Sequence, residues 1–77
     1  MKFQIEFTDT FCGEANYAWV KRAQFEAPEH ATRATLIRRG KRALGLTARH
    51  IATEYSDTVQ LDFIGEHTRA FITHMEG

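Results

Sequence analysis

The feature that most constrains the fold is a change of hydrophobic period along the chain. Apolar and polar residues alternate with a period of two near the N-terminus, give way to one helical stretch between Thr32 and Leu44, and then alternate again. A period of two is typical of strands with one buried and one solvated side, whereas a helix repeats every 3.6 residues. The sequence therefore predicts a two-layer α+β domain, with one helix packed on an antiparallel sheet in the order ββαβββ. A single domain spanning residues 1–77 is expected, because a chain of this length supports only one core.

Two strands are predicted before the helix, over residues 2–8 and 17–26. In the first, aromatic and aliphatic residues alternate with polar ones, and a polar, irregular stretch is expected over residues 9–16. In the second, Tyr17, Trp19, Ala23 and Phe25 fall on one side. Lys21 interrupts this apolar side, which predicts either a β-bulge or a lysine stem lying along the surface.

Three short strands are predicted after the helix, over residues 50–55, 58–63 and 69–74, because β-branched and aromatic residues are frequent there. Short turns join them, as in hairpins. Two registers stay open for the last strand: either Phe71 and Thr73 or Ala70 and Ile72 face inward.

The helix has recognisable ends. Thr32 is suited to the N-cap, Gly45 to the position after the last turn, and Leu46 to the apolar contact that follows such a glycine. On a helical period the apolar side holds Leu36, Ile37, Gly40, Ala43 and Leu44, and the opposite side holds Arg38, Arg39 and Arg42. Gly40 costs about 1 kcal/mol relative to Ala inside a helix. Its place on the buried side predicts close approach of a bulky sheet residue, for which Trp19 is the candidate.

Charge is balanced overall but sorted along the chain. Ten basic and ten acidic residues give a net charge of zero. The basic residues between His30 and Arg49 are Arg33, Arg38, Arg39, Lys41, Arg42 and Arg49, and no acidic residue lies among them. From His50 to the C-terminus, acidic residues, including Glu76, outnumber the single Arg69. Two interpretations stay open: cations favoured by the helix dipole, or a charged binding face.

No spacing in the chain indicates catalysis or metal binding. His30, His50, His67 and His74 show no helical i, i+4 pairing, and Cys12 has no partner thiol. The acidic residues sit at outward-facing strand positions rather than as a buried pair. We therefore expect no enzyme, no cofactor and no metal. Without paired cysteines, an apolar leader or a long apolar run, the expected location is the cytoplasm, with no membrane partner.

The most distinctive segment is TDTFCGEANYAWVKR, from Thr8 to Arg22. Together with the start MKFQIEFTDTF and the helix sequence RRGKRALGL, it resembles a group of very small proteins encoded by phages and mobile elements, and within them anti-CRISPR proteins of type I systems. The resemblance implies a stoichiometric inhibitor that binds a Cas protein or CRISPR surveillance complex in the host cell, with no cofactor and no turnover. It transfers no functional residues.

A specific protein interface takes about 800 Å² from each partner, and its strongest contacts are aromatic or arginine residues. The candidate partner-binding residues are Phe11, Glu14 and Asn16 in the first loop and Arg38, Arg39 and Arg42 on the helix. Acidic strand positions are a further candidate. The alternative function is a small nucleic-acid-binding or regulatory phage protein that places the same arginines on phosphates. A third alternative is a homodimer that pairs through an exposed sheet edge.

Overall fold

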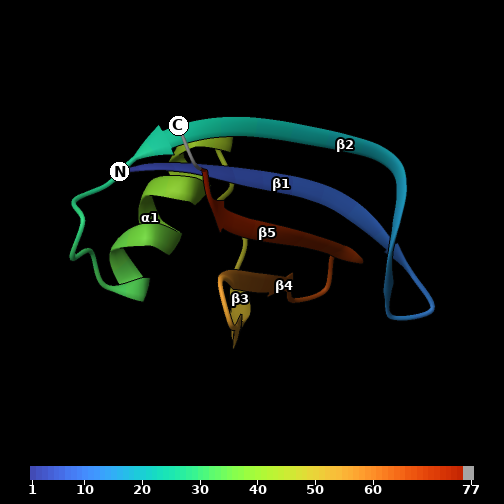
Figure 1. Cartoon of the computed structure of the whole chain (residues 1–77). Helices are drawn as coiled ribbons and strands as arrows, with labels where there is room; N and C mark the ends of the chain where they lie inside the picture. The colour runs from blue at the N-terminus through green and yellow to red at the C-terminus, as the bar shows by residue number, and fades with distance from the viewer. Residues whose placement is uncertain (76–77) are drawn as a thin grey trace.

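Five strands form one antiparallel sheet, and one helix packs against one of its faces, in the computed structural model, which describes residues 1–75 (Figure 1). Glu76 thus lies outside the described residues. In chain order the elements are β1 Lys2–Phe11, β2 Glu14–Glu26, α1 Arg33–Leu44, β3 His50–Tyr55, β4 Thr58–Phe63 and β5 Thr68–His74. The strands lie side by side in the order β2-β1-β5-β4-β3. The predicted α+β fold and the order ββαβββ are confirmed.

The first two strands are longer than predicted and extend into residues 9–16, for which the sequence predicted an irregular stretch; irregular pairing with β2 is confined to the shift between Thr8 and Thr10. Cys12 and Gly13 both have positive φ, at 54° and 81°, and they join Phe11 to Glu14 in a two-residue turn. Turns of this handedness match the twist of the flanking strands, so the hairpin continues to its tip. The pairing of β1 with β2 shifts register between Thr8 and Thr10. The bulge therefore lies here and not at Lys21, whose backbone pairs regularly with Phe7.

The core lies between α1 and the face of the sheet that the helix covers, which we call the inner face. Its buried residues are Ile5, Ile37, Val59, Leu61, Phe63, Ala70 and Ile72. The register of β5 is thus settled, because Ala70 and Ile72 are buried while Phe71 is only partly covered on the outer face. Since successive strand residues alternate between faces, a shift by one residue would expose this whole set.

The predicted helix ends are confirmed. The Thr32 hydroxyl accepts a hydrogen bond from the Thr35 amide at 3.2 Å. Gly45 has φ of 68°, and the amide of Leu46 donates to the Lys41 carbonyl at 2.8 Å. This pairing satisfies carbonyls left free by the last turn, and Leu46 then packs against the core.

Gly40 lies close against the sheet on the buried side of α1. A Cβ there would lie 3.0 Å from Cδ1 of Ile72 and 3.3 Å from both Cδ1 of Ile5 and Cε1 of Phe25. Close approach is confirmed, but the choice of Trp19 is wrong, because Trp19 packs instead on Phe7 with ring centroids 5.1 Å apart.

Two further details of the predicted faces need correction. Ala43 is exposed although the helical period placed it on the buried side. Tyr17 has φ of 55° and lies near Glu6, which belongs to the outer face, rather than beside Trp19. The positive φ breaks the alternation that would have kept both aromatic residues on one side.

The helix covers only part of the sheet. It packs mainly on β2, β1 and β5, while β3 and β4 extend beyond it (Figure 1). Part of the inner face therefore lies beside the helix rather than under it.

Candidate functional site

A groove of about 920 Å³ lies between α1, the loop that follows it, and β3. Its apolar lining comes from Ala34, Ile37, Leu46 and Ala52. Its cationic lining comes from Arg33, Arg38, Lys41 and Arg42 of α1. The groove therefore combines an apolar floor with a rim of positive charge.

Lys41 and His50 form a fixed pair in this groove. The Lys41 Nζ donates to the Ala48 carbonyl at 2.7 Å and lies 3.2 Å from His50 Nδ1 and 5.8 Å from the centre of the Phe63 ring. Partial burial, and secondly the charge of Lys41, lower the pKa of His50. The imidazole is therefore neutral at neutral pH, and its Nδ1 accepts the hydrogen bond from the lysine.

An ion pair links the helix to β3 near the groove. Arg33 Nη1 lies 3.7 Å from Glu54 Oε2, and both side chains are about half exposed. Such an exposed pair contributes little to stability, so a competing acidic partner can displace Glu54 at small cost.

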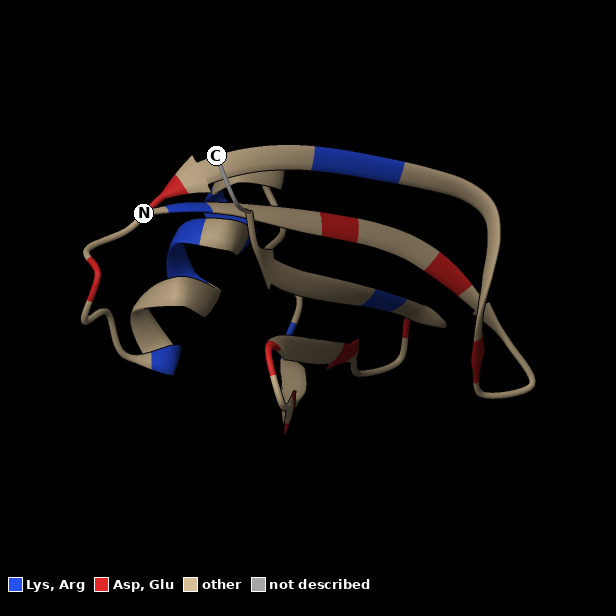
Figure 2. Cartoon of the chain, viewed as in Figure 1, with Lys and Arg blue, Asp and Glu red and all other residues tan. Residues whose placement is uncertain are grey.

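The three predicted arginines lie together on α1. Arg38 and Arg42 line both the groove and a second hollow of about 390 Å³, between α1 and the end of β2, which Arg39 also lines. Arg39 has a structural role too, because its Nη1 donates to the Glu26 carbonyl at 2.9 Å. Figure 2 shows basic segments and no acidic one along α1, while acidic segments are scattered over strands and loops.

The three predicted loop residues lie on the hairpin that joins β1 to β2. Phe11 is 70% exposed at the tip. Asn16 is less free, because its Nδ2 donates to Asp9 Oδ2 at 2.9 Å. This bond, opposed by partial burial and aided by the Ala18 amide, lowers the pKa of Asp9. Asn16 therefore serves to shape the hairpin.

The hairpin tip is anchored to β5. Arg69 Nη2 donates to the Gly13 carbonyl at 2.9 Å, and its Nε donates to Asp62 Oδ1 at 2.6 Å. Burial raises the pKa of Asp62, but hydrogen bonds from Gln60 and Arg69 outweigh it, so that the pKa falls below its ordinary value. The carboxylate thus stays charged and holds Arg69 under the tip.

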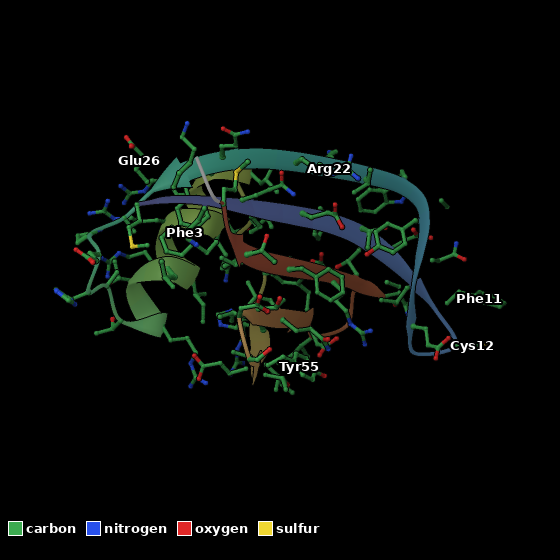
Figure 3. The ribbon with its side chains drawn as sticks, in the orientation of Figure 1. Phe3, Phe11, Cys12, Arg22, Glu26 and Tyr55 are labelled. Atoms are coloured by element: carbon green, nitrogen blue, oxygen red, sulfur yellow. The ribbon has the colours of Figure 1, made fainter. Side chains whose placement is uncertain are left out.

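The two predicted groups do not meet. Figure 3 shows Phe11 and Cys12 at the free end of the hairpin, whereas Glu26, next to Arg39, lies at the opposite end of the molecule. Sequence reasoning missed the groove, although helical spacing places Lys41 one turn from Ile37 and so on its edge. Arg33, Lys41 and His50 are additions to the candidate site.

Comparison with protein-family models, with curated proteins and with solved structures yields no match. Within residues 1–75, no helix is long and apolar enough to cross a membrane. In the same residues, no group of three or more histidine, cysteine, aspartate or glutamate side chains could hold a metal ion.

Proposed function

We propose that this protein is a stoichiometric inhibitor that acts by binding an acidic surface of a larger protein. The observation that supports it best is the groove beside α1, in which an apolar floor is framed by Arg33, Arg38, Lys41 and Arg42. The resemblance of the sequence to anti-CRISPR proteins suggests the target: a Cas protein or CRISPR surveillance complex in the host cytoplasm.

The combination of apolar floor and cationic rim favours a protein over a nucleic acid. Binding of phosphates depends on cations, and an apolar floor contributes nothing to it. Protein interfaces, in contrast, have an apolar centre and are enriched in arginine. A partner that places an apolar side chain on Ile37 and Ala52 and carboxylates on the arginines would satisfy both features.

The hairpin tip offers a second contact. Phe11 is exposed, and Arg69 donates a hydrogen bond to Gly13 in the turn that follows it. Ordering such an element on binding costs less entropy than ordering a free loop. Because no residue that lines the groove belongs to the hairpin, the contributions of tip and groove can be measured separately.

The test is a pull-down of the tagged protein with purified CRISPR surveillance complexes and Cas nucleases, with and without nuclease treatment. We expect a Cas subunit to stay bound after nuclease treatment. The double variant Arg38→Glu, Arg42→Glu should lose this binding, whereas Lys21→Glu, which changes an exposed cation on β2, should keep it. Phe11→Ala tests the tip alone.

Two results would count against the proposal. Retention of nucleic acid alone, with affinity that falls log-linearly with salt, would favour the alternative function of a small nucleic-acid-binding phage protein. Retention of neither class by a folded protein would exclude the proposed target.

A further inference from the structure

The two edges of the sheet differ in how well they resist pairing with another strand. β3 forms one edge and β2 the other, and nothing in residues 1–75 lies beyond β3 in the sheet order (Figure 1). The free N–H and C=O groups of an edge strand are a template for a further strand. Proteins that stay monomeric block such edges with lysine, proline, bulges or inward-pointing charge.

The β2 edge carries these blocking features. Lys21 points to the inner face, since it pairs with Phe7, and Arg22 follows it on the outer face. Nearer the hairpin tip, β2 is distorted by two features. Its pairing with β1 shifts register between Thr8 and Thr10, and Tyr17 has a positive φ. A flat second strand cannot follow this edge along its whole length.

The β3 edge carries only one of them, the inward-facing charge of Glu54, which pairs with Arg33. Its sequence, HIATEY, contains no lysine and no proline, and it pairs with β4 without a register shift. Ile51 and Tyr55 are 61% and 54% exposed on its outer face. A strand added at this open, regular edge would place its own side chains beside Ile51 and Tyr55.

We propose that β3 pairs antiparallel with β3 of a second copy, about a two-fold axis perpendicular to the sheet that passes midway between the Ala52 residues of the two copies. Opposed residues of paired strands share a face, so one residue of β3 must lie opposite its own counterpart at the axis. This axis aligns residues 49–55, that is β3 and the residue before it, whereas an axis between the two Thr53 residues would leave Arg49 outside the matched segment.

The side chains of β3 are self-complementary in this register. On the inner face His50 lies opposite Glu54 of the second copy, and the carboxylate comes near the Lys41 cation that contacts His50. On the outer face Ile51 lies opposite Thr53, a favourable β-branched pair, and Tyr55 lies opposite Arg49. An axis between the two Thr53 residues would instead place Glu54 opposite Ala52, which offers the carboxylate no cation.

The pairing would continue the sheet and bring the two grooves together. Because opposed residues share a face, both helices lie on the same side of the joined sheet. Each groove borders its own β3, so the cationic rims of the two copies frame one wider surface. A single pair of six-residue strands buries less than the roughly 800 Å² per partner of a stable interface, so the dimer should dissociate on dilution.

Sedimentation velocity over a wide range of protein concentration tests the pairing. We expect a reversible shift from monomer to dimer as concentration rises. Thr53→Lys places a cation on the exposed edge and should raise the dissociation constant about tenfold or more. Gln24→Lys, the matched change on the outer face of the β2 edge, should leave it unchanged. Circular dichroism confirms that each variant is folded.

Disulfide trapping tests the register. In a Cys12→Ser background, oxidation should cross-link Ala52→Cys to its counterpart much faster than Thr53→Cys, because only position 52 lies opposite itself. Faster cross-linking at position 53 would overturn the register. A wild-type protein that stays monomeric at every concentration, or equal loss of dimer in Thr53→Lys and Gln24→Lys, would overturn the proposed surface.

Discussion

At the scale of single residues, Gly40 shows how close packing overrides local preference. Glycine weakens a helix interior, yet only a hydrogen at this position leaves room for Ile72, Ile5 and Phe25 at normal contact distance. The atoms that a Cβ would meet are the ends of side chains, which can yield by a few tenths of an ångström. A methyl group is therefore near the limit of what fits, and a larger side chain exceeds it.

We predict that Gly40→Leu lowers the free energy of unfolding by about 1–3 kcal/mol or more, because it overpacks the core. Gly40→Ala should be close to neutral, since the gain of about 1 kcal/mol in helix propensity offsets the crowding. Urea denaturation of both variants measures the difference. Equal stability of the leucine variant and the wild type would show that the helix can lift from the sheet without cost.

At the scale of elements, the β1–β2 hairpin is held by β5 as well as by its own turn. Arg69 reaches the Gly13 carbonyl, and the Thr10 amide donates to the His67 carbonyl at 2.8 Å. Hydrogen bonds thus hold one side of the hairpin tip to β5 and the turn before it, and β5 itself pairs with β1 and β4. Loss of the fastening should loosen the tip without unfolding the sheet.

We predict that Arg69→Met increases the motion of residues 10–16 on the nanosecond scale, because the anchor at Gly13 is lost while the aliphatic stem is kept. NMR relaxation should show lower order parameters at the tip and unchanged values in β4. Arg22→Met removes the exposed bond to Glu6 and serves as the control. Equal order parameters in the Arg69 variant and the wild type would contradict the anchoring role.

The elements were predictable from the sequence where local chemistry determines them. Thr32 and Gly45 predicted the helix ends because each acts within one turn. The Thr32 side chain accepts a hydrogen bond from the first turn, and the Gly45 backbone adopts a positive φ after the last one. The Cys12–Gly13 turn was missed, since a cysteine with positive φ is uncommon and gives no sequence signal. The groove was missed because its position depends on where the helix crosses the sheet. That crossing is determined by contacts between residues far apart in the sequence, such as Gly40 and Ile72.

At the scale of the whole molecule, stability depends on pH through a partly buried histidine. The pKa of His50 lies below its ordinary value of 6.5, so between these two values the unfolded chain binds more protons than the folded one. The free energy of unfolding therefore falls as pH decreases through this window and is fully recovered above pH 6.5.

We predict that His50→Gln flattens this dependence, because glutamine keeps an acceptor for Lys41 but takes up no proton. Urea denaturation of both proteins between neutral pH and the onset of carboxylate titration measures the slope. His67→Gln changes an exposed histidine outside the groove and serves as the control. If the free energy of unfolding of the His50 variant depended on pH as steeply as that of the wild type, a group other than His50 would be responsible.

The unequal edges of the sheet also decide how far self-association can proceed. Pairing through β3 uses the β3 edge of both copies and leaves one β2 edge at each end of the joined sheet. Lys21 and the bulged register then stand where a third copy would have to add. The assembly thus closes at two copies and cannot grow into a fibre, since polymerisation requires an open edge at each end.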